Sequence, residues 1–281
     1  MSLLDTPLWE VIKASFSVKV WSGLIGAIGD TLYMTIVSSL IMLVFGLVGG
    51  IVLTIMCPDG LFPARGAYTV LGGLINILRS LPQMVMIIIM IPVARAIFGK
   101  SYGTNACIIA IAASCIPMYA RIVESSLLEI GKGKIEAARS LGSTNFQIIT
   151  RILLPETLPS LLRGFTVAVI GVISMTALAG MFGAGGIGDI AVRFGYQRFQ
   201  HEVLFACIYI LVLLVQGTQW AGSFISNRIL KKRCLLATAD GGIKPHRVNR
   251  NKKHNRILKI REKKKRSLSK RRQYYEKIIY F

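Results

Sequence analysis

The residues whose types and spacing could transmit mechanical work lie in one polar stretch of this chain. Glu136-Ala137-Ala138 is followed after three residues by Gly142, and after nine more by Ile152-Leu153-Leu154-Pro155. Glu, Ala, Arg and Leu favour a helix before the glycine, and Gly142 suits a left-handed helix C-cap. Thr144 and Gln147 then offer a capping box for a second helix. The pattern predicts a helix–glycine–helix elbow that can dock into a groove on a partner, although an ordinary loop is also compatible with it.

The second arm of this elbow is predicted to be amphipathic. Its apolar face is formed by Phe146, Ile148, Ile149 and Ile152.

The sequence contains no residue pattern that suits covalent chemistry. It contains no nucleophile–base arrangement and no His/Cys/Asp/Glu cluster with metal-ligand spacing, and its five cysteines include no CxxC pair. The G-x4-G-K-[ST] loop that cradles ATP phosphates is also absent. We therefore expect a protein that is not an enzyme, with no catalytic residue, no metal and no cofactor of its own.

Long uncharged stretches must position the elbow. The chain is 53% hydrophobic and only 17% charged, and a bilayer core about 30 Å thick needs roughly 20 apolar residues in a helix. We predict an all-α integral membrane protein with about five transmembrane helices and a cytoplasmic coupling-helix elbow. The predicted spans are residues 31–56, 66–94, 101–120, 164–188 and 203–227.

The second predicted span is interrupted by polar residues. Proline kinks a helix, and a charge inside a membrane is costly unless it faces protein or water. We interpret 66–94 as one broken span whose polar break faces inward, while a helix break that merely satisfies Arg79 with backbone carbonyls fits almost as well. The candidate translocation-path residues are Asn76, Arg79, Ser80, Pro82 and Met84.

The distribution of basic residues predicts the orientation in the membrane. Short cytoplasmic loops are rich in Lys and Arg, and the most basic segments are 121–156 and the C-terminus. Both can face the cytoplasm, which places the N-terminus outside. Residues 1–28 are then an extracytoplasmic or interfacial segment, in which Trp9, Ile12 and Phe16 share one helical face; an ordinary packing helix fits the same pattern.

A glycine-rich turn follows the fourth predicted span on the outer side. Its spacing matches a dinucleotide fingerprint, but that motif must follow a strand, so the match is accidental. A docking loop for an extracytoplasmic protein is one interpretation and a plain loop is the other. The residues concerned are Gly183, Gly185, Gly186 and Gly188.

The net charge of +21 is concentrated in a tail. Residues 231–281 hold 19 Lys/Arg and 3 Asp/Glu, or +16, whereas residues 1–230 hold 15 and 10, or +5. Blocks of like charge resist folding, so we expect a disordered cytoplasmic extension to a membrane domain spanning 29–230. Contact with anionic lipids remains an alternative, and nucleic acid is the less favoured partner.

The elbow resembles a known signature. The pattern EAA-x3-G-x9-I-x-L-P is similar to that of permease subunits in bacterial ATP-binding-cassette importers, and every defined position is matched. The resemblance implies a coupling helix that inserts into a cleft of a separate ATPase, with a tight turn at Gly142 and a helix ending at Pro155. The implied coupling residues are Glu136, Ala137, Ala138, Gly142, Ile152, Leu154 and Pro155.

Other segments resemble the methionine uptake permeases within that family, over about residues 25–230. They are 76–82, 120–127, 183–189 and 194–199. The resemblance implies a multi-pass protein of the bacterial cytoplasmic (inner) membrane. Its implied partners are a second copy of itself, two ATPase subunits that use the ATP, an extracytoplasmic substrate-binding lipoprotein and membrane lipids.

Two other functions remain open on the sequence. One is an importer permease for another amino acid. The other is an autonomous secondary transporter or channel, although such proteins usually show internal hydropathy repeats and none is obvious here.

Overall fold

The computed structural model describes residues 8–100 and 102–239, and within these ranges it contains helices and turns but no strand. The contacts divide the chain into two units, Met1–Leu230 and Lys231–Phe281. The helices in chain order are α1 (Leu8–Ser15), α2 (Val18–Met56), α3 (Arg65–Ser80), α4 (Gln83–Phe98), α5 (Thr104–Leu128), α6 (Lys132–Ser140), α7 (Asn145–Gln147), the π-helical η1 (Ile148–Leu153), α8 (Leu154–Gly180), α9 (Gly186–Ile190), the π-helical η2 (Ala191–Tyr196) and α10 (His201–Ala239).

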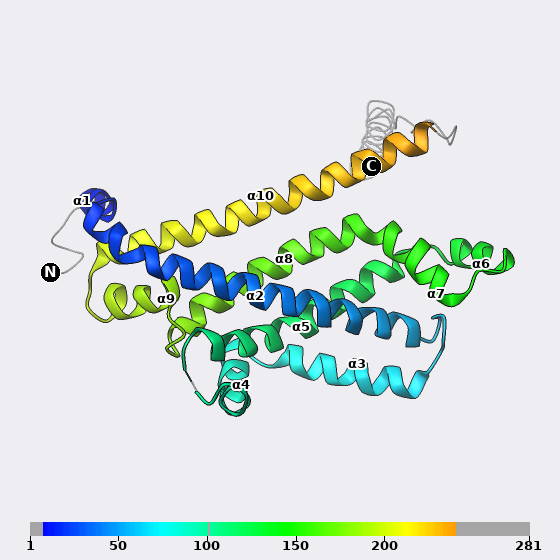
Figure 1. Cartoon of the computed structure of the whole chain (residues 1–281), viewed down its shortest axis with the longest axis horizontal. Coiled ribbons are helices and arrows are strands. Elements are labelled where there is room, and N and C mark those ends of the chain that lie inside the picture. The colour runs from blue at the N-terminus through cyan, green and yellow to red at the C-terminus, as the bar shows by residue number, and fades with distance from the viewer. Residues whose placement is uncertain (1–7, 101, 240–281) are drawn as a thin grey trace, which may run out of the picture. The chain divides into compact units, whose positions relative to one another are not determined.

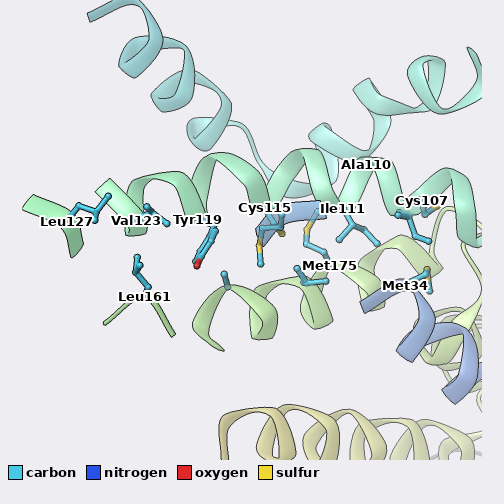
Figure 2. Packing of buried hydrophobic residues seen from close by; sticks show 14 of the residues in the cluster. Met34, Cys107, Ala110, Ile111, Cys115, Tyr119, Val123, Leu127, Leu161 and Met175 are labelled. Carbon is cyan, nitrogen blue, oxygen red and sulfur yellow. The ribbon is translucent and has the colours of Figure 1, made fainter. Parts of the chain in front are cut away.

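Three long helices, α2, α5 and α8, lie side by side and form the centre of the first unit (Figure 1). Their shared core follows α5, whose side chains from Cys107 to Leu127 face Met34 of α2 and Leu161 and Met175 of α8 (Figure 2). Tyr119 is fully buried there and meets the ring of Phe165 edge-on at 5.7 Å. The small elbow helices α6 and α7 lie at one end of this bundle, and α9 lies at the other.

The helices confirm the predicted class of about five transmembrane segments. Within the described residues, four helices are long and apolar enough to cross a membrane, and a fifth crossing results if α3 and α4 count as one broken span. These two helices meet at 109° around Leu81 and Pro82. The break predicted inside 66–94 is therefore present, and its second half runs on to Phe98.

Several predicted span limits were wrong: charged residues did not end α2 or α5, and a glycine turn ended α8 early. Helix α2 begins at Val18 rather than 31, so residues 18–28 are its first turns, and Asp30 lies on its exposed side. Helix α5 continues beyond residue 120 to Leu128. Helix α8 ends at Gly180 rather than 188, because the chain turns at Gly183 and Gly185 with φ of +75° and +78°.

The N-terminal helix α1 is short, and its exposed side is aromatic. Trp9 and Phe16, which directly follows the helix, are exposed and Ile12 is 38% exposed, whereas Val11 and Ser15 are buried. The Phe16 ring meets that of Tyr209 in α10 edge-on at 5.4 Å. The helix therefore packs on one side, and its predicted apolar face is open at Trp9 and Ile12 but contacts α10 through Phe16.

Helix α10 reaches further than the predicted fifth span. It begins at His201 and continues to Ala239, so the first residues of the segment predicted to be disordered are helical. The remainder of that prediction, for residues 240–281, lies outside the described part of the chain.

Candidate functional site

The predicted elbow is present, and local sequence rules explain its first arm. Helix α6 ends in a Schellman motif, in which the Ser143 amide donates to the Ala138 carbonyl at 3.1 Å and the Gly142 amide donates to the Arg139 carbonyl at 2.9 Å. The motif needs a residue in the left-handed region, and Gly142 has φ of +79°. Glycine adopts this conformation without a Cβ penalty, so Gly142 reverses the chain within one residue.

The second arm begins with the predicted capping box. The Gln147 amide donates to Thr144 Oγ1 at 3.3 Å, and the Thr144 amide donates to Gln147 Oε1 at 3.0 Å. These bonds satisfy amides that the first turn of a helix otherwise leaves without partners.

The prediction that the second arm ends at Pro155 was wrong. The chain is helical without a break from Asn145 to Gly180, so the arm and the span are one helix. Pro155 lies just after the π-helical stretch Ile148–Leu153. A proline ring collides with the carbonyl four residues back in an α-helix; here that carbonyl belongs to Arg151, inside a wider π turn. The elbow is thus joined rigidly to a membrane span.

The elbow residues divide into a buried and an exposed set. Ala138, Ile148 and Leu153 belong to the main core, and Ile152, Leu154 and Pro155 are half-buried. Glu136, Ala137 and Gly142 are exposed. The predicted apolar face of the second arm is split, since Ile148 is buried whereas Phe146 points outward.

Two large apolar side chains stand exposed at the tip of the elbow. Leu141 is 86% exposed and Phe146 is 73% exposed, on either side of Gly142. Exposed apolar side chains near the bend of a polar segment are typical of a docking surface. We call Glu136, Ala137, Leu141 and Phe146 the elbow tip.

Polar contacts fasten the elbow to the membrane domain. Lys134 of α6 pairs with Glu156 of α8, and Arg139 donates to the Leu61 carbonyl at 3.5 Å. Beneath the elbow lies a cavity of about 340 Å³, lined by α2, the turn after it, α5, α6 and η1. Few direct contacts therefore join α6 to the α2–α3 turn.

The candidate translocation-path residues are not gathered into one site. Asn76, Arg79, Ser80 and Pro82 are exposed on the single chain, and Met84 is 39% exposed. Of these, only Arg79 lines the groove of about 530 Å³ beside α5. The rest of that groove is formed by Met118, Arg121, Ile122, Glu124, Ser125 and Leu128.

A polar cluster around the buried Glu124 carboxylate, beside this groove, was missed by the sequence reasoning. Glu124 accepts from Arg121 Nη1 at 2.6 Å and from the Tyr68 hydroxyl at 2.9 Å. Arg121 and Glu124 were predicted to lie in a cytoplasmic loop because they are charged. Their spacing of three residues was the available signal, since opposite charges at that spacing pair on one helix.

The four glycines of the outer turn differ in their surroundings. Gly183 is exposed and Gly185 is half-buried, whereas Gly186 and Gly188 are buried against α2 and α8. The Ile187 amide donates to Thr31 Oγ1 at 2.9 Å. Two of the four therefore pack the short helix α9, and only Gly183 and Gly185 remain open to a docking partner.

Comparison with protein families places these features in a known group. Residues 46–231 match the family described as the binding-protein-dependent transport system inner membrane component. The matched region contains the broken span, the elbow and the outer turn.

Individual relatives extend the match. The chain is 36% identical over 206 residues to a probable D-methionine transport system permease of Vibrio cholerae, covering 73% of this chain and 92% of the relative. It is 37% identical over 172 residues to the methionine import system permease of Bacillus subtilis, covering 61% and 78%. A solved structure of the MetNI methionine ABC transporter in inward-facing conformations superposes with a TM-score of 0.74 at 36% identity, over 76% of this chain and 99% of that one.

Proposed function

Because the chain belongs to the binding-protein-dependent transport system inner membrane component family, we propose that it is the permease subunit of an ATP-driven importer for methionine. The elbow is the observation that carries the coupling role. It presents Leu141 and Phe146 to a partner, and it continues without a helix break into α8.

The coupling mechanism follows from this connectivity. One arm of the elbow follows α5 in the chain, and the other runs into α8, so α5 ends and α8 begins at the docking surface. Closure of an ATPase dimer moves the elbow, and the spans then rock between inward- and outward-facing states. The chain contributes a pathway with different affinities in its two states and performs no covalent step.

The proposed assembly contains two copies of this chain, two ATPase subunits and an extracytoplasmic substrate-binding protein. ATP is bound and used by the ATPase chains, and the permease itself holds no cofactor. In the bacterial inner membrane the N-terminus lies outside and the elbow lies in the cytoplasm. The substrate path is proposed along the break at Pro82 and the groove lined by Arg79 and Met118.

Uptake by proteoliposomes tests the substrate and the orientation together. The complex of this chain with its co-purified ATPase is reconstituted, with binding protein and labelled methionine outside and ATP trapped inside. We expect methionine accumulation that stops without internal ATP and that excess unlabelled methionine suppresses. Uptake of another amino acid in place of methionine would support the importer assignment but change the proposed substrate. Uptake independent of ATP would support a secondary transporter.

Replacing Phe146 by Asp is expected to weaken attachment of the ATPase. Burial of such a side chain contributes about 1.5–3 kcal/mol, and about 1.4 kcal/mol corresponds to a tenfold change in affinity, so binding should weaken about tenfold or more. The measurement is ATPase retained on the immobilised permease at graded concentrations. The matched control is Phe199→Asp. Phe199 is 69% exposed and lies between η2 and α10, far from the elbow in the sequence. Equal retention of the ATPase by both variants would contradict the proposal that Phe146 contacts the ATPase.

A further inference from the structure

The cluster of Tyr68, Arg121 and Glu124 joins two membrane helices at a buried point. The Glu124 carboxylate lies in α5 and is only 5% exposed; it accepts from Arg121 at 2.6 Å and from the Tyr68 hydroxyl of α3 at 2.9 Å. Arg121 Nη2 also donates to the Gly72 carbonyl of α3 at 2.8 Å. Ionisable groups within membrane segments are costly and usually serve a function.

A glycine leaves room for Arg121 to approach α3. A Cβ at position 72 would lie 3.0 Å from Arg121 Nη2, tighter than about nine in ten real Cβ contacts, so the guanidinium would have to shift. With no side chain there, the guanidinium reaches a backbone carbonyl of the neighbouring helix. We call Tyr68, Gly72, Arg121 and Glu124 the α3–α5 clamp.

Among the described residues, α3 has few other buried contacts outside the clamp. One small buried cluster, Leu53, Ile75 and Ala120, packs it against α2 and α5. On its other side Val70, Leu74 and Ile77 are exposed. Since the polar contacts are directional and meet at the buried Glu124 carboxylate, they fix the register of α3 on α5 more tightly than this small apolar patch does.

The clamp lies between the elbow and the broken span along the chain. It lies near the end of α5, and the chain then passes through Glu129–Gly131 into α6, which carries part of the elbow tip. At its far end, α3 leads into the break at Leu81 and Pro82. A displacement of the elbow that moves the end of α5 therefore reaches the broken span through the clamp.

We infer that the α3–α5 clamp makes α3 move as one body with α5, so that Tyr68, Arg121 and Glu124 are positioning residues that couple ATP hydrolysis to transport. This inference rests on the proposed function. The clamp also holds the groove wall in place, because Arg79 of α3 faces Arg121 and Glu124 of α5 across that groove.

The first test compares Tyr68→Phe and Glu124→Gln with the unaltered complex. Tyr68→Phe removes one hydroxyl and leaves the Arg121–Glu124 pair intact, so its folding is least at risk. Allosteric couplings typically amount to factors of 5–150, and we expect methionine moved per ATP hydrolysed to fall about fivefold or more while the ATPase remains attached. Thr69→Ala removes a hydroxyl that donates to the Arg65 carbonyl within the same helix, and this variant should keep the ratio unchanged.

The second test measures the movement itself. Spin labels at Val70 on α3 and Leu128 on α5, in a background without the native cysteines, report the distance between the helices. We expect the same distance in the ATP-free and ATP-bound unaltered complex, and a shifted or broadened one in both clamp variants but not in Thr69→Ala. An ATP-driven change of this distance in the unaltered complex would overturn the inference.

A fall of uptake and ATP hydrolysis in equal proportion would also overturn it, since that result describes a purely structural role. If instead the unaltered complex hydrolyses ATP but moves no methionine, the proposed substrate fails, and the label distances still decide whether α3 follows α5.

Discussion

Replacing Gly142 by Pro is expected to abolish ATP-dependent uptake while leaving the chain in the membrane. Gly142 has φ of +79°, whereas proline is confined to about −65°. The substitution also removes the amide that donates to the Arg139 carbonyl at 2.9 Å. The chain cannot then reverse after α6, so the elbow tip no longer forms. We expect uptake to fall to background and ATPase co-purification to be lost.

A graded series separates backbone conformation from side-chain size at this position. Nothing lies within 4 Å of a Cβ at Gly142, so space is not limiting. The left-handed conformation costs a residue with a Cβ about 1–2 kcal/mol, and Asn tolerates it better than Ala. Uptake should therefore decrease in the order Gly, Asn, Ala, Pro. Gly133→Ala, at an exposed helical position of α6 with open space around it, should retain full uptake; a Gly142→Pro variant as active as this control would refute the elbow's role.

Gly188→Leu should destabilise the membrane domain itself. A Cβ at Gly188 would lie 2.2 Å from the carbonyl oxygen of Ala177 in α8, and 2.6 Å from its Cα. Both are backbone atoms, so no side chain can move aside, and α9 must separate from α8. Overpacking of this kind costs about 3 kcal/mol or more. We expect a lower Tm in detergent and little monodisperse protein by size-exclusion chromatography.

Gly171→Ala provides the matched control in α8, the helix against which Gly188 packs. Nothing lies within 4 Å of a Cβ at that position, and alanine favours a helix over glycine by about 0.5–1 kcal/mol. Its Tm should equal or exceed that of the unaltered protein. A Gly188→Leu variant with an unchanged Tm would show that α8 and α9 are not packed as described.

The elbow could be predicted from sequence because its causes are local. A glycine after a run of helix formers gave the left-handed turn at Gly142, and Thr144 with Gln147 gave the capping box. Each rule involves residues within a few positions of one another. The apolar stretches likewise indicated the spans, since length and composition alone decide whether a helix can cross a bilayer.

The missed features depend on contacts between distant segments. The pair Arg121–Glu124 is tolerated inside α5 because Tyr68 and Gly72 of α3 satisfy it, and nothing local predicts that packing. The continuous helix through Pro155 depends on the π-helical stretch before it. The burial of Gly186 depends on Thr31, which lies far away in the sequence. Charge and proline were therefore poor guides to where these helices end.

The most direct test of the account is where the ATPase touches this chain. A photo-crosslinking phenylalanine analogue is placed either at Phe146 of the elbow tip or at Tyr102. Tyr102 is 69% exposed and directly precedes the start of α5, whereas the elbow follows the end of α5. Illumination of the assembled complex should give a covalent adduct with the ATPase from position 146 and none from position 102. An intact, ATP-hydrolysing complex that gives no adduct from position 146, or an equal adduct from position 102, would contradict the claim that the elbow couples the ATPase to the membrane spans.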